Sequence, residues 1–393
     1  MKDRKRVEET DVTTETIIAD RFAVDFRTPL PEFDTVGATA YTAMDLVSKD
    51  RAVYALVQRP GVPRRDIVVG KLIRRAVPGL ACPRGEGIAT ATDRDGNGQR
   101  MVTVVDRPEG GRIVDHIRGF SPFTESRLRE TIIPQMLDIF SALSSRGIAH
   151  RSVSLRNLYY RSRDKTELML GECFSAPPAY HQSAGYEVIE RAGALPEGRG
   201  EGGIPTDMFA FGVMLFSLVR GHDLAESSSG PDLLDTRIHK GSFLAIGGRS
   251  EPGGMSVLLK GLMEDNPSLR WTPEDVRGWL EGISPKKSSH DINDMGWNLN
   301  KSVYLRDRAY KDRRSLALAM LQYPSDALDL IQRDRFLDDL QKALPEGRSR
   351  EWLDRALGTG KLSVTLADEK QSENMALARV FAILYPDGPL SFG

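Results

Sequence analysis

One short segment constrains this chain more than any other, a polar loop that directly follows an amphipathic helix. Residues 132–148 carry apolar side chains at helical spacing, and Gly147 is placed to cap the C-terminal end of that helix. The next eight residues read His150-Arg151-Ser152-Val153-Ser154-Leu155-Arg156-Asn157. The pattern therefore predicts a helix that delivers a loop rich in hydrogen-bonding side chains.

This loop resembles the catalytic loop H-R-D-x-x-x-x-N of protein kinases, with Ser152 in place of the aspartate. In the family, that aspartate accepts the proton of the substrate hydroxyl and orients it, and a serine hydroxyl does neither at neutral pH. The resemblance therefore implies a kinase-like fold without its catalytic base. Asn157 keeps the position of a metal-binding asparagine, although an asparagine in a loop also bonds readily to its own backbone.

Five further landmarks appear in the order that the family requires. They are the hinge-like segment Val104–Gly111, the strand and metal-site segment Leu168–Phe174, the end of the activation segment Tyr186–Glu190, the buried-helix segment Thr206–Val213 and the helix junction Asp265–Arg270. The resemblance implies structural roles for Arg151, Glu190, Asp207 and Arg270. It pairs Glu190 with Arg270 in a buried ion pair, and it directs the Asp207 carboxylate at the backbone amides of the catalytic loop.

The positions that hold phosphate in the family depart from its pattern. The segment Val36–Met44 resembles the glycine-rich loop L-G-x-G-x-F-G-x-V of the family. It keeps the first glycine as Gly37, but Thr39 and Thr42 stand at the other two glycine positions. A side chain there obstructs the approach of backbone amides to phosphate. Val57 stands in place of the lysine of V-A-I-K, so no cation is left for the α- and β-phosphates.

The metal and adenine positions depart as well. Glu172 replaces the aspartate of D-F-G, and its extra methylene displaces a carboxylate that Mg²⁺ needs in near-ideal octahedral geometry. The hinge amide that binds adenine falls at Pro108, which has no N–H, although a shift of one residue would restore the donor. The remnant of a nucleotide pocket comprises Gly37, Ala55, Asp106, Pro108, Asn157 and Glu172.

We therefore expect no catalytic residue, no metal and no cofactor, with Val57, Ser152 and Glu172 as the degenerate positions. Asn157 and Glu172 are weak candidates for a metal site, and ATP with Mg²⁺ would bind weakly. General-base loss alone typically costs about 10²–10⁴ in rate. This loss favours a structural or regulatory use of the fold over phosphoryl transfer.

Composition agrees with an ordinary soluble chain. The 393 residues include 54 basic and 55 acidic side chains, a balance that indicates neither nucleic acid nor a charged membrane surface as a partner. The longest apolar stretch, Met208–Val219, is too short to span a bilayer. Cys82 and Cys173 fall in separate lobes of the expected fold, so we expect no disulfide framework and a location in a reducing cytoplasm.

The predicted fold class is α+β: a two-lobed protein-kinase-like fold, with a β-rich N-lobe and an α-helical C-lobe, followed by a small all-α C-terminal domain of four or five helices. We expect a disordered acidic and threonine-rich tail over residues 1–20, an N-lobe over about 21–106, a C-lobe over about 107–283, a linker over 284–302 and the helical domain over 303–393.

Three functions stay open at this stage. The first is a catalytically inactive kinase-like scaffold of bacterial-type signalling, which binds proteins through its C-lobe and C-terminal helices. The second is an atypical enzyme that binds nucleotide through Asn157 and Glu172 and slowly transfers a phosphoryl or nucleotidyl group to a protein serine or threonine. The third is a purely structural subunit. Threonines set among acids in Glu8–Thr16 also resemble tails that phosphothreonine-reading fork-head-associated modules recognise, with a merely solvated tail as the alternative.

Overall fold

The computed structural model describes most of the chain, and its contacts divide the chain into two units. The described residues are 15–93, 96–115, 119–180, 182–192, 194–227, 231–247, 254–283, 298–333, 335–358 and 369–386. The first unit comprises residues 1–111 and 159–177, and the second comprises residues 112–158 and 178–393. This β-rich first unit and helical second unit agree with the predicted kinase-like fold.

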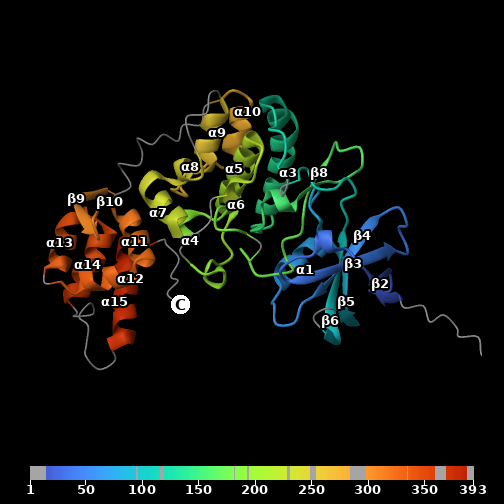
Figure 1. Ribbon diagram of the computed structural model, residues 1–393, viewed down its shortest axis with the longest axis horizontal. Helices are drawn as coiled ribbons and strands as arrows, with labels where there is room; N and C mark the ends of the chain where they lie inside the picture. Colours follow the sequence, from blue (N-terminus) through green and yellow to red (C-terminus); the bar gives the residue numbers. More distant parts are fainter. Residues whose placement is uncertain are drawn as a thin grey trace, which may run out of the picture. The chain divides into compact units, whose positions relative to one another are not determined.

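The first unit is built on a six-stranded antiparallel sheet with the order β1-β2-β3-β4-β6-β5 (Figure 1). The strands are β1 (Glu15–Ile18), β2 (Phe22–Pro29), β3 (Ala38–Asp45), β4 (Ala52–Gln58), β5 (Pro83–Asp93) and β6 (Gly96–Asp106). Alternate side chains, including Val53 and Val57 of β4 and Val104 of β6, point into one apolar core. This alternation is the period of two that a half-buried strand produces.

Shorter elements complete the first unit. They are the 3₁₀ turn η1 (Pro31–Phe33), helix α1 (Asp66–Arg74) and the two-stranded sheet of β7 (Leu158–Tyr160) and β8 (Leu168–Leu170). Helix α1 buries Val68, Val69 and Leu72. Cys82 and Cys173 both belong to this unit, so their predicted placement in separate lobes is wrong; both are buried and neither forms a disulfide.

Helices dominate the second unit. They are α2 (Glu125–Arg127), α3 (Ile133–Ser144), α4 (Ile189–Ala192), α5 (Ile204–Arg220), α6 (Leu224–Ser227), α7 (Pro231–Lys240), α8 (Ser242–Ala245), α9 (Gly254–Leu262) and α10 (Pro273–Leu280), with short turns η2 (Leu128–Ile132), η3 (Leu155–Asn157) and η4 (Pro196–Gly198). Helix α5 is buried at every residue from Thr206 to Leu218. A Cβ on Gly212 would lie 2.8 Å from the Cβ of Leu262, so this glycine lets α5 approach α9 closely.

The C-terminal part of the second unit is not all-α, in contrast to the prediction. It begins with the hairpin of β9 (Asn298–Leu305) and β10 (Arg308–Asp312), and continues with α11 (Arg313–Gln322), α12 (Pro324–Ile331), α13 (Phe336–Ala343), α14 (Arg348–Gly358) and α15 (Glu369–Leu384). The hairpin forms because Val303, Leu305 and Tyr310 bury their side chains among these helices. The region therefore starts at residue 298 rather than 303.

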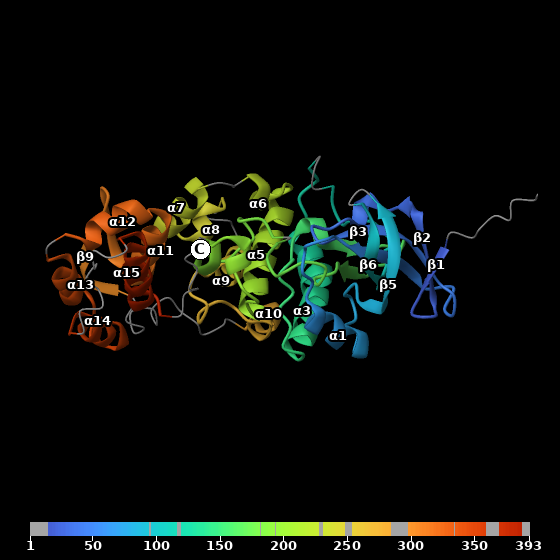
Figure 2. The same ribbon diagram turned by 90° about the horizontal axis from the view of Figure 1, so that it is seen from below.

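This C-terminal region shares one core with the helices before it. Ile189 of α4 and Ile238 of α7 belong to the same apolar cluster as the C-terminal helices, and α11 lies beside α7 in both Figure 1 and Figure 2. The Asp235 carboxylate of α7 accepts hydrogen bonds from Arg308 and from the Tyr323 hydroxyl, the latter at 3.0 Å. The C-terminal region is thus an integral part of the second unit.

Two predicted boundaries also change. Residues 15–18 form β1, which pairs with β2 in the sheet, so the prediction of a disordered tail is wrong for these residues. Residues 1–14, with most of the threonine-rich motif, and residues 284–297 of the predicted linker lie outside the described residues. Of the helices that the structure does describe, none has the length and apolar character needed to cross a bilayer.

Candidate functional site

The polar loop after α3 is held by a carboxylate from the start of α5. The N–H groups of His150 and Arg151 donate to the two carboxylate oxygens of Asp207, at 2.6 and 2.8 Å. All three residues are buried. Asp207 thus satisfies two amides that would otherwise be left in the interior without a partner, where each lost hydrogen bond costs about 1–3 kcal/mol.

Arg151 then extends into a buried ion pair that the sequence analysis did not assign. Its guanidinium donates to both carboxylate oxygens of Glu187, at 3.1 and 2.9 Å, and neither side chain is exposed to solvent. The backbone of Arg151 has φ 64°, a left-handed conformation that turns the chain sharply at this residue. Because Glu187 lies three residues before Glu190, the segment 186–190 supplies two buried carboxylates rather than one.

Glu190 forms the second of these pairs, with Arg270. The Arg270 guanidinium lies 3.2 Å from Glu190 and also donates to the carbonyl oxygens of Pro205 at 3.2 Å and Glu264 at 2.7 Å. The Arg270 side chain is fully buried. This pair ties α4 to the segment that precedes α10.

Ser152 and Asn157 bond to each other inside the loop. The Asn157 amide nitrogen donates to the Ser152 carbonyl oxygen at 3.0 Å and to the Ser152 hydroxyl at 3.1 Å. The Ser152 N–H donates to Nδ1 of His150 at 3.2 Å. The loop therefore presents a hydroxyl where the protein-kinase motif has a carboxylate, and a neutral serine hydroxyl is far too weak a base to accept a proton near neutral pH.

Tyr186, in the turn before α4, also bonds to this loop. Its hydroxyl donates to the Asp223 carboxylate at 3.1 Å and accepts the N–H of Leu155 at 3.4 Å. Burial, and next the carboxylate of Asp223, raise the pKa of Tyr186 well above its ordinary value. The phenol therefore stays protonated and keeps donating.

The other predicted site residues lie in the first unit, where Glu172 caps its own loop. One Glu172 carboxylate oxygen accepts the N–H of Phe174 at 2.6 Å and that of Ser175 at 2.8 Å. The Ser175 hydroxyl donates to the other oxygen. This carboxylate, buried and 4% exposed, thus organises residues 172–175.

The loop that Glu172 organises packs against the chain between β2 and β3. A Cβ on Gly37 would lie only 1.8 Å from the Ser175 carbonyl oxygen, so only glycine fits there. The same oxygen accepts a hydrogen bond from the Gln58 side chain at 2.8 Å, and the Ser175 hydroxyl lies 2.9 Å from that of Thr35. The backbone of residues 173–176 therefore occupies the space beside Gly37.

The predicted register of the glycine-rich loop is wrong. Residues 38–45 form β3, in which Thr39 pairs with Val57 and Thr42 pairs with Tyr54. The connection between β2 and β3 is instead residues 30–37, which contain η1. Alternating alanine, threonine and larger apolar residues favour a strand, and this preference outweighs the partial match to a glycine motif.

Val57 and Ala55 face the apolar core of the sheet. Both are fully buried, and they belong to the cluster that also includes Tyr41 and Val102. A lysine at position 57 would enter an apolar environment, which disfavours its charged form.

The amides of the hinge segment bond to the protein itself. The N–H of Arg107 donates to Ala52, and the N–H groups of Glu109 and Gly110 donate to the carbonyl oxygens of Arg161 and Tyr160. Pro108 has no N–H. If the hinge alignment is shifted by one residue, the adenine-binding position falls at Arg107 or Glu109. The backbone N–H of each of these residues already donates to a carbonyl oxygen of the protein.

Asp106, which ends β6 at the start of the hinge segment, and three aromatic rings of the first unit have partners within that unit. The Asp106 carboxylate pairs with Arg84 at 2.5 Å. Phe33 stacks on Tyr54 at a ring distance of 4.8 Å and lies 5.8 Å from the ring of Tyr159. Burial, followed by the charge of Glu172, raises the pKa of Tyr54 well above its ordinary value, so the phenol stays neutral.

The predicted site residues thus divide between the two units. Gly37, Ala55, Val57, Asp106, Pro108 and Glu172 belong to the first, and Arg151, Ser152, Asn157, Glu190, Asp207 and Arg270 belong to the second. Within the described part of the chain, no three or more His, Cys, Asp or Glu side chains are grouped so that they could hold a metal ion.

Two curated protein kinases are similar in sequence to about half of this chain. The calcium/calmodulin-dependent protein kinase cmkA of Emericella nidulans is 28% identical over 198 residues, which cover 47% of this chain and 46% of that protein. A calcium/calmodulin-dependent protein kinase of Metarhizium anisopliae is 25% identical over 204 residues, 47% of this chain and 50% of that protein. The chain spans about half the length of the curated relatives it matches.

Two other comparisons add less. No protein-family model matches the chain. The crystal structure of Rad53 residues 1–466 in complex with AMP-PNP aligns with a TM-score of 0.47 and 18% identity, over 65% of this chain and 63% of that one.

Proposed function

We propose that this chain is a catalytically inactive protein-kinase-like module that binds protein partners in signalling. The observation that carries the proposal is the Glu172 carboxylate, which accepts two backbone amides and the Ser175 hydroxyl. A carboxylate so engaged would have to release its own loop before it could bind Mg²⁺. At this position the chain uses the side chain to build structure.

Three further observations in the first unit support the same proposal. The Ser175 carbonyl oxygen fills the space beside Gly37, where the family brings phosphate close to glycine. Val57 offers no cation, and the hinge amides of Arg107, Glu109 and Gly110 already have partners. Each departure removes a different contact to nucleotide, so no single reversion would restore binding.

Location and cofactor requirement are part of the proposal. We infer a cytoplasmic protein of bacterial-type signalling that needs neither a metal nor a nucleotide to fold. Unbridged, buried Cys82 and Cys173 support a reducing compartment. The apolar core that each unit already has supports folding without a ligand.

A slow kinase-like enzyme is the second candidate, because both curated relatives carry the name of a protein kinase. In this chain, Asn157 and Glu172 would have to hold the metal between them and give up their present hydrogen bonds. Transfer to a protein serine or threonine would then proceed without a base at position 152.

Phosphoryl transfer by the purified full-length chain separates the two candidates. The assay follows transfer of labelled γ-phosphate from Mg-ATP to the chain itself and to a generic serine and threonine substrate. We expect no transfer above the rate of a boiled sample. The matched variant changes both Ser152 and Asn157 to alanine. In a native host that lacks the chain, this variant should restore function as well as the unaltered chain does.

Phosphoryl transfer by the unaltered chain that disappears in the double variant would overturn the proposal that the chain is catalytically inactive. A double variant that melts normally but fails to support the host would lead to the same conclusion, because it would show that the host needs these two loop residues rather than the fold.

A further inference from the structure

A groove in the C-terminal region runs between the hairpin and the helices that cover it. Two adjoining cavities, of about 320 and 200 Å³, share Tyr304, Leu330 and Arg333 in their walls. The larger cavity is lined on one side by the four successive residues Lys301–Tyr304 of β9 and on the other by α12 and α13. We call these two cavities together the β9 groove.

The strand that lines the groove has an unpaired edge. Among the described residues, β9 pairs with β10 alone, so its other edge carries backbone groups outside any ladder. The register of the hairpin also shifts between Tyr310 and Asp312, so that the four residues 299–302 of β9 lie opposite the single residue Lys311. An unpaired strand edge presents a row of backbone N–H and C=O groups with which another extended chain can pair. The groove wall therefore offers hydrogen bonds to an extended chain.

The floor of the groove is apolar. Leu330 of α12 and Phe336 and Leu340 of α13 line the larger cavity, together with Val303 of β9. These four side chains are themselves buried in the core of the C-terminal region. An extended ligand would therefore meet apolar groups with every second side chain and the strand edge with its backbone.

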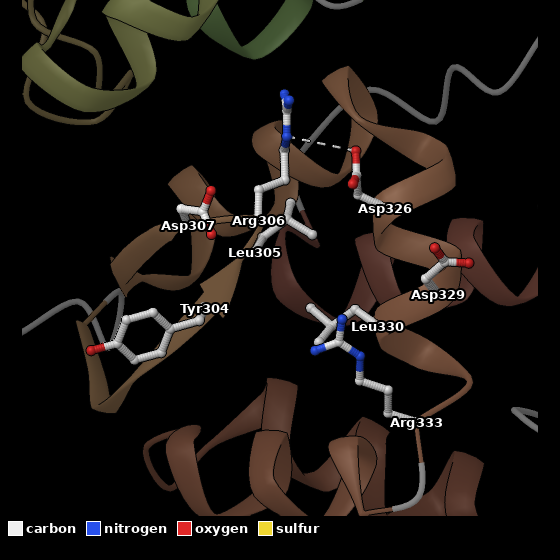
Figure 3. Close-up of a pocket in the computed structure, with 8 residues that line it drawn as sticks. All are labelled: Tyr304, Leu305, Arg306, Asp307, Asp326, Asp329, Leu330 and Arg333. Carbon is white, nitrogen blue, oxygen red and sulfur yellow. Dashed lines mark ion pairs between the residues drawn. The ribbon is translucent and has the colours of Figure 1, made fainter.

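Arg333 lies in the walls of both cavities, and Asp339 of α13 is the acidic residue in the lining of the larger one. Figure 3 shows the Arg333 side chain, which follows the C-terminal end of α12, extending toward Leu330 and the hairpin, whereas the carboxylates of Asp307 and Asp329 point away. Asp326 faces Arg306, at 3.8 Å. Arg333 makes no side-chain hydrogen bond or ion pair with another described residue, and neither does Lys301 at the far end of the larger cavity. The guanidinium thus presents its fork of donors to the groove.

We propose that the β9 groove binds an extended segment of a partner protein, which adds to β9 as a further strand and places an acidic side chain on Arg333. A carboxylate is the group that the planar guanidinium binds with two parallel hydrogen bonds. The segment is a short one, because the four groove residues of β9 span about 13 Å at roughly 3.3 Å per residue. The biological use of this surface rests on the proposed scaffold function, and it names the chemistry of the partner.

The test uses the full-length chain and a capped, fluorescein-labelled peptide of about eight alternating valine and glutamate residues, a length that covers β9. We expect saturable binding by fluorescence anisotropy, and a loss of about tenfold or more in affinity for Arg333→Glu, a step of one decade in Kd. Lys342→Glu is the matched control: it reverses an exposed cation on α13 outside the groove and should change affinity by less than about twofold. A peptide with lysine for glutamate should bind the Arg333→Glu chain better than it binds the unaltered one.

A second peptide, methylated at alternate backbone nitrogens, tests strand addition separately. This peptide keeps its side chains but cannot donate hydrogen bonds to β9, so its binding should be lost. Equal binding of the methylated peptide, equal loss with both charge reversals, or no saturable binding would overturn the proposal. Binding that appears only after residues 1–14 are removed would assign the groove to the chain's own acidic segment, and exclusion of the peptide by dimerisation would assign it to a second copy. The peptide assay contains no nucleotide, so a failure to bind peptide leaves the proposal of catalytic inactivity intact. Conversely, phosphoryl transfer by the chain would leave the proposal of peptide binding in the groove intact.

Discussion

Two buried arginines hold the segment around the polar loop, and each depends on one carboxylate. Arg151 binds Glu187 with its two terminal guanidinium nitrogens, and Arg270 binds Glu190 together with two backbone carbonyl groups. A buried ion pair adds little stability compared with apolar packing, but removing one partner strands a charge in the interior. These residues therefore act as structural anchors.

Replacing Arg270 with alanine should lower the free energy of unfolding by about 3–5 kcal/mol, because the Glu190 carboxylate then loses its counter-ion. Ser152→Ala is the control. It removes one hydrogen bond from the Asn157 amide, which keeps the Ser152 carbonyl, and should cost about 1 kcal/mol. Urea unfolding of both variants measures the difference, and small equal effects would argue against the anchoring role.

Two glycines of the first unit should respond in opposite directions to alanine. Gly37→Ala places a methyl group 1.8 Å from the Ser175 carbonyl oxygen, so the loop of residues 172–175 must move, at a cost of about 1–3 kcal/mol. Gly70 lies within α1 with open space at its Cβ, so Gly70→Ala should stabilise by about 0.5–1 kcal/mol. Thermal melts of the two variants check the signs, and a neutral Gly37→Ala would show that the loop does not pack as described.

At the scale of residues, the sequence predicted the contacts of Asp207 and Arg270, because a family motif places each partner at a defined spacing. It missed Glu187, since only one of two glutamates in the segment 186–190 was given a role. It also misplaced Thr39 and Thr42, because a strand of small residues fits a glycine motif loosely. The one available signal for Glu187 was a second acidic residue in a segment that is otherwise apolar.

At the scale of elements, the C-terminal hairpin shows what periodicity alone does not reveal. Helices were predicted over residues 303–393, and α11 to α15 form within that range. Strands β9 and β10 were not predicted, because their burial depends on the helices that cover Val303 and Tyr310 rather than on their own pattern. For the same reason the groove beside β9 was not foreseen.

Tyr310 should make the attachment of this hairpin sensitive to alkaline pH. Burial raises the pKa of Tyr310 to about 12, from an ordinary value of 10.0, and its hydroxyl lies 3.3 Å from Nε2 of His239 on α7. The unfolded chain therefore releases this proton at lower pH than the folded chain does. Its stabilising contribution is complete below pH of about 10 and is lost as the pH rises toward about 12.

The comparison of Tyr310→Phe with the unaltered chain isolates this effect. Urea unfolding at several pH values should show a smaller alkaline loss for the phenylalanine variant, because that variant has no proton to release. Identical pH profiles would mean that Tyr310 titrates in the same range in both states.

At the scale of the whole molecule, the C-terminal region is not a detachable domain. Ile189 and Ile238 share its core, and Asp235 of α7 binds Arg308 and Tyr323. A chain that stops after Ile283 should therefore melt several degrees lower, since burying even one such isoleucine contributes about 1.5–3 kcal/mol. An unchanged melting temperature, with no added protease cleavage in α7, would contradict this integration. Point changes in the groove, such as Arg333→Glu, are accordingly a cleaner probe of partner binding than truncation.

The central claim is that the kinase-like fold no longer binds nucleotide, and calorimetric titration of Mg-ATP into the full-length chain tests it most directly. Engaged hinge amides, a buried Val57 and the self-capped Glu172 predict no measurable heat and no rise in melting temperature at millimolar Mg-ATP. A ligand present at a hundred times its Kd would instead stabilise by about 2.7 kcal/mol. Saturable binding that weakens when Asn157 is changed to alanine would contradict the account.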